Sequence, residues 1–260
     1  MSSLEDFQRD GYAIFPSVLT SAECDSLRTR AAEIAQHSSS QSTFPTTDRP
    51  HDSDPEFLKS AEQIHVFWEP NSDPTLGLDA VNKIAHTLHR DDLAFAQISQ
   101  KQIIQSILHQ LNYPNPIFIQ SMFIPKSPRI GGLVRPHQDS TFIRSNPKPC
   151  IALWFALEDA DEENGALWIS PGSHHGPLRQ LYHRRGDALE LEDCDHTPYP
   201  TERTTIPASK GTCIAFTGGV VHGSLENKSK RSRHAYTLHV VDAGSHYHEN
   251  NWIPFPNQPT

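Results

Sequence analysis

Short apolar runs bounded by glycine, proline and polar residues dominate the second half of the chain, whereas apolar residues at helical spacing are confined to the first half. Apolar runs and alternating patterns are typical of strands, and they predict strands at residues 11–16, 64–69, 117–124, 150–160, 166–169, 212–217 and 235–241. The pattern fits a mainly β protein with flanking helices, a double-stranded β-helix of the cupin-like jelly-roll type. We expect a single domain over residues 1–260, with helical support mainly in 20–111 and the β-helix core mainly in 115–242.

Three segments of the first half carry apolar residues at helical intervals. Thr20 and Glu23 have the spacing of a capping box, which predicts a helix over residues 21–37. The spacing of Val81, Ile84 and Leu88 predicts a second helix over residues 75–89, which contains Lys83. A third helix is expected at residues 94–111, before the prolines at 114 and 116 break the pattern.

Length and charge exclude several classes of protein. The chain has 260 residues and a formal net charge of −9, and no stretch is rich enough in lysine and arginine to suggest a nucleic-acid partner. It has no apolar run long enough to cross a membrane and no signal-peptide pattern at its start. Its four cysteines show no paired spacing, so we expect reduced thiols and a cytoplasmic location.

The segment with the strongest candidates for a functional site is residues 131–142, where His137 and Asp139 are separated by one residue. On an extended strand this spacing places both side chains on the same face. An imidazole beside a carboxylate supplies part of the facial site that holds non-haem Fe(II). The chain has 16 histidines, so an isolated pair of this kind is weak support for a metal site.

A distant histidine and an arginine make the pattern more specific. His222 follows the expected strand 212–217 and is our candidate for the third metal ligand. Arg233 stands eleven positions later, across a polar turn-like segment, and a hairpin would bring it back beside His222. Its guanidinium fork suits a bidentate carboxylate, such as the far end of 2-oxoglutarate.

Other candidate metal sites are weaker. His174 and His175 are adjacent and would point in opposite directions on an extended chain. His246 and His248 have better spacing, but we interpret them as surface histidines. The acidic turn at residues 159–165 lacks the alternating ligands of a calcium loop.

Four segments resemble the phytanoyl-CoA dioxygenase family of Fe(II)/2-oxoglutarate oxygenases and, within it, the group of phytanoyl-CoA dioxygenase domain-containing proteins. They are residues 132–142 (GLVRPHQDSTF), 164–174 (NGALWISPGSH), 222–224 (HGS) and 233–236 (RHAY). The resemblance covers nearly the whole chain in order and implies the same jelly-roll fold. It also implies that His137, Asp139 and His222 bind Fe(II) as the catalytic centre, with 2-oxoglutarate as cosubstrate.

The resemblance implies further contacts to 2-oxoglutarate. Arg233 and Ser224 would hold its far carboxylate, and Lys83, Met122 and Trp154 would line its pocket. Pattern alone assigns Met122 and Trp154 to the core, and assigns Lys83 to a solvated helix surface. Gln138 is expected on the opposite strand face, where a structural hydrogen bond is its main role, although its peptide can contact the cosubstrate.

The substrate is left open by the sequence. By resemblance, the expected reaction is oxidative decarboxylation of 2-oxoglutarate to succinate, coupled by dioxygen to hydroxylation of a small organic or acyl substrate. Phe142, Trp168 and Trp68 are candidates for an apolar pocket, although aromatic residues are commonly core. A basic patch for coenzyme A would require Arg179, Arg184 and Arg185 to cluster.

Two long polar segments are also ambiguous. Residues 38–56 are either a surface loop or a lid over the active site, with preference for the loop. Residues 176–210 look like an irregular insertion between strands.

Two other functions compete with an oxygenase. One is a metal-binding protein of the same fold with little or no turnover, acting as a binding or scaffold module. The other is a cupin-like isomerase or zinc hydrolase. The intact set of His137, Asp139, His222 and Arg233 argues against a protein that has lost turnover. The isomerase and the hydrolase need no clamp for a cosubstrate carboxylate, so Arg233 favours the oxygenase over both.

Overall fold

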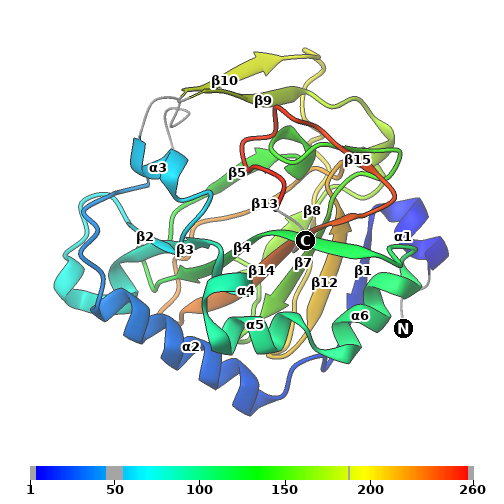
Figure 1. The fold of residues 1–260 in the computed structure, drawn as a ribbon. Helices are drawn as coiled ribbons and strands as arrows, with labels where there is room; N and C mark the ends of the chain where they lie inside the picture. The colour runs from blue at the N-terminus through cyan, green and yellow to red at the C-terminus, as the bar shows by residue number, and fades with distance from the viewer. Residues whose placement is uncertain (1–3, 45–54, 187, 257–260) are drawn as a thin grey trace.

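Two antiparallel β-sheets organise the computed structural model, which describes residues 4–44, 55–186 and 188–256 (Figure 1). The larger sheet has seven strands in the order β1 (Tyr12–Phe15), β12 (Cys213–Thr217), β7 (Ile151–Ala156), β14 (Arg233–Asp242), β4 (Pro116–Lys126), β3 (Val81–His86) and β2 (His65–Trp68). The smaller sheet has four, in the order β11 (Thr204–Thr205), β8 (Leu167–Ile169), β13 (His222–Ser224) and β5 (Val134–His137). The prediction of a mainly β jelly roll is confirmed.

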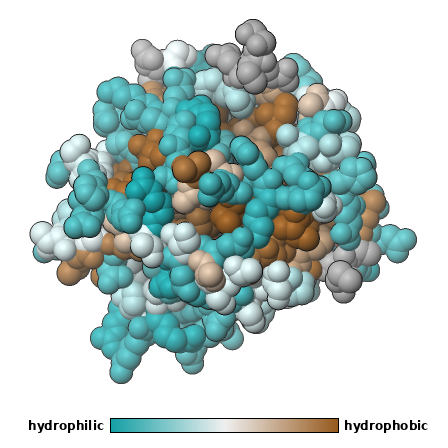
Figure 2. All heavy atoms as spheres, turned by 60° about the horizontal axis from the view of Figure 1, so that its bottom comes forward, coloured by the Kyte–Doolittle hydropathy of each residue, from teal (hydrophilic) through white to brown (hydrophobic). Residues whose placement is uncertain are grey.

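Helices cover the outer face of the larger sheet. They are α2 (Ser21–Gln36), α4 (Leu88–Asp91), α5 (Leu93–Ser99) and α6 (Gln102–Gln110), and Figure 1 shows α2, α5 and α6 side by side below the sheet. The helix α1 (Leu4–Asp10) precedes β1 at the edge of that sheet, whereas α3 (Pro55–Lys59) packs its Phe57 with Phe67 and Trp252 in a separate cluster. Figure 2 shows a surface of mainly hydrophilic residues with separate apolar areas between them. Within the described residues, no helix is long and apolar enough to cross a membrane.

Smaller elements complete the fold. Short 3-10 helices lie at η1 (Pro74–Ala80), η2 (Asp139–Thr141) and η3 (Ser173–His175). Two further pairs of strands are formed by β9 (Gln180–Arg185) with β10 (Ala188–Asp193) and by β6 (Ser145–Asn146) with β15 (His246–Tyr247). The division of residues 1–260 into helical support and β-helix core stays a prediction.

Side chains on strand β7 alternate between two apolar clusters. Leu153 and Phe155 join the cluster between the larger sheet and the helices, whereas Trp154 joins the cluster between the two sheets. Successive residues of β7 therefore face opposite sides of the larger sheet. Burial of each large apolar side chain stabilises the fold by about 1.5–3 kcal/mol.

The capping box at the start of α2 is formed as expected. The Glu23 amide donates to Thr20 Oγ1 over 3.2 Å, and the Thr20 amide donates to Glu23 Oε2 over 2.8 Å. These bonds satisfy amide groups that the first turn of a helix leaves without partners.

The expected helix over residues 75–89 is wrong. The segment is the 3-10 helix η1, the strand β3 and the short helix α4, so Lys83 lies on a strand. Every residue of β3 is buried, and a strand buried on both faces loses the alternation that distinguishes it from a helix. The third expected helix, 94–111, is two helices, because the chain leaves helical conformation between Ser99 and Gln102.

The insertion at residues 176–210 is more regular than its composition indicates. It contains the hairpin of β9 and β10, which lies at the top of Figure 1, and β11, which extends the smaller sheet beside β8. Prolines outside the strands and charged residues within β9 and β10 conceal this pattern in the sequence.

Candidate functional site

His137 and Asp139 meet at the end of a strand. β5 ends at His137, and Asp139 begins η2, so the two residues do not share one extended strand as predicted. The turn nevertheless brings their side chains together, with 3.5 Å between His137 Nε2 and Asp139 Oδ1. Asp139 is buried, which removes the carboxylate from most of the solvent.

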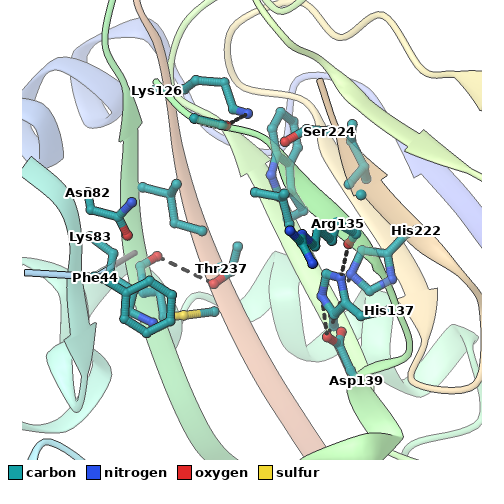
Figure 3. Close-up of a pocket in the computed structure, with 18 of the residues that line it drawn as sticks. Phe44, Asn82, Lys83, Lys126, Arg135, His137, Asp139, His222, Ser224 and Thr237 are labelled. Atoms are coloured by element: carbon teal, nitrogen blue, oxygen red, sulfur yellow. Dashed lines mark hydrogen bonds and ion pairs between the residues drawn. The ribbon is translucent and has the colours of Figure 1, made fainter. Parts of the chain in front are cut away.

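His222 joins them from the neighbouring strand. It begins β13 and is the register partner of His137 on β5, which places the two ring centroids 4.2 Å apart. His222 Nε2 lies 3.6 Å from Asp139 Oδ1. Each of the three side chains offers one ligand atom, and these atoms all lie within 4.8 Å of one another (Figure 3). Within the described residues, this is the one such cluster of potential metal ligands.

Backbone carbonyl groups orient both imidazoles. His137 Nδ1 lies 2.8 Å from the carbonyl oxygen of Arg135, and His222 Nδ1 lies 3.1 Å from that of Val220. Each Nδ1 can therefore donate to a backbone carbonyl group, which leaves each Nε2 free to bind a metal beside Asp139. Two neutral imidazoles and one carboxylate are the donor set of a facial Fe(II) site, so these residues fit that metal.

The electrostatics suit metal binding near neutral pH. Burial opposes ionisation of Asp139, but nearby His222 and His239 outweigh it and hold the pKa of the carboxyl well below its usual range. Burial, together with His137, lowers the pKa of His222 to about 4. Burial also opposes protonation of His137, but the hydrogen bond with Asp139 raises its pKa overall. An anionic carboxylate and a neutral His222 are the forms that bind a metal.

Arg233 reaches this region from the other sheet. It begins β14 and pairs with Lys126 on β4, so the predicted hairpin that would pair it with the strand of His222 is wrong. Its Nε donates to the Gly165 carbonyl over 3.2 Å, and its guanidinium carbon lies 5.5 Å from the centre of the Trp154 ring. Burial lowers its pKa to about 10, so the group is charged at pH 7.

One guanidinium nitrogen of Arg233 is left for a ligand. The residue is 2% exposed, and its Nη1 has no hydrogen-bond partner within the described part of the chain. A buried charged donor without a partner is costly. A carboxylate in the adjacent pocket would remove this cost by accepting a charge-assisted hydrogen bond.

Lys83 is a second buried cation in the same region. Its Nζ lies 3.3 Å from the centre of the Phe44 ring, and it faces Phe44 in Figure 3. Burial lowers its pKa to about 7. The position on a solvated helix surface that pattern alone suggests for Lys83 is therefore wrong. Its ammonium group could instead pair with an anion bound in this region.

A cavity of about 350 Å³ connects these groups between the two sheets. Met122, Trp154 and Ser224, which the family resemblance assigns to the cosubstrate, all line it together with the metal-binding cluster, Arg233 and Lys83. Gln138 is not among the lining residues. Its Nε2 donates to the carbonyl groups of Gly219 over 2.8 Å and Pro177 over 3.2 Å, which is the structural role expected for it.

The candidate substrate residues separate into two groups. Phe142 lines the cavity, whereas Trp68 and Trp168 are buried outside it. Phe44 also lines the cavity, but most of the possible lid at 38–56 lies outside the described residues. His174 is bonded to the Gln8 carbonyl over 3.0 Å and takes no part in the cavity.

The three arginines considered for coenzyme A do not form a free basic patch. Arg179 is buried and donates to backbone carbonyl groups of residues 177, 197 and 198. Arg184 donates to the Trp252 carbonyl over 3.4 Å, and Arg185 lies 3.1 Å from the Glu190 carboxylate.

Several polar residues that line the cavity were not predicted from the sequence. They include Glu69, Asn82, His86, Gln120, Lys126, Thr237 and His239. Arg233, Thr237 and His239 alternate along β14 and share the face toward the cavity. Once Arg233 was chosen, this period of two could have identified His239. Asn82, His86, Gln120 and Lys126 lie on strands whose register the sequence does not reveal, and Glu69 directly follows such a strand.

Comparison with known proteins places the chain in a family. The family described as Phytanoyl-CoA dioxygenase (PhyH) matches residues 7–235. A protein named Phytanoyl-CoA dioxygenase from Arabidopsis thaliana is 34% identical over 268 residues, which cover 98% of this chain and 94% of the relative. The Phytanoyl-CoA dioxygenase domain-containing protein 1 of Bos taurus is 33% identical over 99% of this chain and 96% of its own length.

Solved structures share the fold at low sequence identity. The epimerase SnoN, solved with Fe3+, alpha ketoglutarate and nogalamycin RO, has a TM-score of 0.69 at 17% identity, over 99% of this chain and 90% of its own. EctD from S. alaskensis in its apoform has a TM-score of 0.70 at 17% identity, over 99% and 84%.

The family match and the curated relatives confirm the predicted enzyme class, a 2-oxoglutarate-dependent dioxygenase, and the iron-binding cluster of the structure agrees with it. The chain belongs to the phytanoyl-CoA dioxygenase family.

Proposed function

We propose that this protein hydroxylates a small organic or acyl substrate while converting 2-oxoglutarate to succinate. His137, Asp139 and His222 would hold Fe(II), the catalytic metal, through two Nε2 atoms and one carboxylate oxygen. When bound, the metal supplies the activation of dioxygen and the oxidation of the substrate. The residues of the chain supply the geometry, a water-poor cavity and the recognition of both small molecules.

The single observation that carries the proposal is that Arg233 Nη1 has no hydrogen-bond partner among the described residues and lies at the cavity that also contains the metal-binding cluster. A zinc hydrolase or a cupin-like isomerase has no need for such a group. A dicarboxylate cosubstrate needs one, because its far carboxylate must be bound away from the metal. In this proposal Arg233 binds that carboxylate, and Ser224 donates a hydrogen bond to it.

The remaining cosubstrate contacts are proposed for Lys83, Met122 and Trp154. Lys83 would place its ammonium near a carboxylate of the bound dicarboxylate, which would also raise its pKa again. Met122 and Trp154 supply apolar surface beside it. For Gln138 we propose only a backbone contact, since its side-chain amide is occupied by backbone carbonyl groups.

The cavity favours a compact, largely apolar substrate. Its walls include many aromatic and aliphatic side chains, among them Phe57, Phe142, Ile143 and Trp252. Its volume of about 350 Å³ must also hold the cosubstrate, which leaves room for a small molecule or one end of an acyl chain. Since Arg179, Arg184 and Arg185 form no free basic patch, we do not assign coenzyme A recognition to them.

Succinate formation tests the proposal. Protein purified without oxygen would be loaded with Fe(II) and 2-oxoglutarate, and succinate would be measured after oxygen is admitted without another substrate. We expect slow uncoupled formation of succinate, which is absent in Asp139→Ala. The matched control is Asp159→Ala, since Asp159 lies in the acidic turn at 159–165.

The alternative is a metal-binding module with little turnover. If wild-type protein binds both Fe(II) and 2-oxoglutarate and forms no succinate, with or without a panel of candidate substrates, the alternative is favoured. If it binds neither, the proposed site itself is wrong.

A further inference from the structure

A third imidazole, that of His239, lies against the metal-binding cluster. Its Nε2 is 3.1 Å from Asp139 Oδ2, whereas His137 and His222 approach the other carboxylate oxygen, Oδ1, at 3.5 and 3.6 Å. The two oxygens of Asp139 are thus divided between two kinds of neighbour. Oδ1 faces the candidate metal ligands, and Oδ2 faces His239.

The chemistry of the contact fixes the hydrogen on His239. An ionised carboxylate only accepts hydrogen bonds, so a stable contact requires that Nε2 carries a hydrogen. His239 Nδ1 is buried and has no hydrogen-bond partner within the described residues, so no other group there competes for the orientation of the ring. Asp139 Oδ2 is likewise buried without a hydrogen-bond partner among the described residues, so the donor of His239 and this acceptor lie 3.1 Å apart and each can satisfy the other.

We propose that His239 is a positioning residue that donates to Asp139 Oδ2 and leaves only Oδ1 for the metal. The inference rests on the proposed function and goes beyond it, because it concerns how many coordination positions of the metal ion the carboxylate of Asp139 would occupy. A carboxylate that bound through both oxygens would take a position needed by 2-oxoglutarate or dioxygen. A hydrogen bond to Oδ2 opposes that binding mode and orients the ligand.

The fold gives His239 a rigid base for this role. It lies on β14, between Gln120 of β4 and Ala152 of β7 in register, and it is 5% exposed. The register of β14 against β4 shifts between His239 and Val240, and such bulges re-aim side chains near active sites. The contact also connects the larger sheet to η2, which carries Asp139 beside the smaller sheet.

Substitutions at position 239 can separate the hydrogen bond from the volume of the ring. Glutamine places an amide nitrogen close to the position of the histidine Nε2, whereas asparagine is too short to do so, and leucine offers no donor. His234→Gln is the matched control, because His234 lies on the same strand, is equally buried at 5% exposed, and is not among the residues that line the cavity.

Affinity for Co(II), measured without oxygen by calorimetry, is the first readout, and the visible spectrum of bound Co(II) is the second. We expect His239→Leu and His239→Asn to weaken Co(II) binding by about 10–100-fold, which is typical for loss of a partner behind a metal ligand. His239→Gln should recover most of this loss, and His234→Gln should bind like wild type. The spectrum should change in His239→Leu, since the carboxylate is then free to bind through both oxygens.

Two results would overturn the inference. Wild-type affinity and spectrum in His239→Leu would show that the contact has no influence on the ligand. A loss in His239→Gln as large as in His239→Leu would show that ring volume, and not the donated hydrogen bond, is what counts. If His239→Leu does not fold, the comparison of glutamine with asparagine still decides. Failure of the wild-type protein to bind Co(II) would instead refute the proposed metal site.

Discussion

The two faces of the larger sheet are built from the same strands but differ in how their buried polar atoms are satisfied. On the outer face, Leu153 and Phe155 of β7 pack with Tyr236 of β14 against the helices. Even the polar atom of Tyr236 is satisfied there, because its hydroxyl lies 2.9 Å from Ser99 Oγ. On the inner face, Arg233 and His239 of the same β14 are buried with polar atoms that have no partner in the described chain.

The difference separates stability from function. The outer face gains free energy mainly from apolar contact, and His234 Nε2 is the exception there, since it is buried without a hydrogen-bond partner among the described residues. The inner face leaves buried charges and acceptors unsatisfied, which costs stability unless a ligand completes them. We therefore expect substitutions on the inner face to alter binding and substitutions on the outer face to alter unfolding.

The largest expected effect is that of Asp139→Ala on the inner face. Removal of the carboxylate should weaken Fe(II) or Co(II) binding by more than about 100-fold, since even a partner behind a ligand contributes 10–100-fold. The measurement is metal affinity without oxygen. Retention of metal at wild-type affinity would show that the inner face holds the ion with other residues.

Phe155→Ala tests the outer face. Phe155 is fully buried between the sheet and the helices, and truncation of such a side chain costs about 3–5 kcal/mol of unfolding free energy. Denaturant unfolding gives this value directly. Affinity for 2-oxoglutarate, measured at a temperature where the variant is folded, should not change, and a large change would break the separation of the two faces.

Arg233→Ala should mainly affect the cosubstrate. Loss of the guanidinium is expected to weaken 2-oxoglutarate binding by about 2–5 kcal/mol, because the far carboxylate would then be buried without its partner. Metal affinity should stay close to that of wild type. Arg231→Ala is the control, since Arg231 is exposed and paired with Asp161 at 2.7 Å. Equal losses in both variants would contradict the clamp.

The sequence predicted the metal cluster better than it predicted the elements that carry it. His137, Asp139 and His222 were identified by residue type and spacing, because the chemistry of Fe(II) demands those groups wherever they lie. The positions of Arg233 and Lys83 relative to their neighbours were predicted wrongly, since strand pairing depends on contacts between distant residues. β14 pairs with β4 and β7, and no local pattern around Arg233 reveals either partner.

Lys83 shows why the inner face is hard to recognise. A lysine is normally exposed, so pattern alone assigned it to a solvated surface. In the structure its Nζ lies over an aromatic ring within a strand that is buried throughout. Only the family resemblance suggested a contact with the cosubstrate, because a functional site can retain a buried charge that stability alone would not favour.

The smallest expected effect is the dependence of stability on pH that Lys83 imposes. Burial lowers its pKa from 10.5 to about 7 in the folded protein, so between these values the unfolded chain binds more protons and stability rises with pH. In ligand-free protein, Lys83→Met should remove about 1–3 kcal/mol of the rise in unfolding free energy between pH 7 and 10. The buried Lys126, whose pKa is lowered to about 6, acts in the same direction and leaves a residual slope. The exposed Lys228→Met should retain the full slope. If the unfolding free energy of Lys83→Met rises with pH as steeply as that of wild type, the ammonium of Lys83 is hydrated in solution. This part of the inner face would then not be a desolvated anion-binding site.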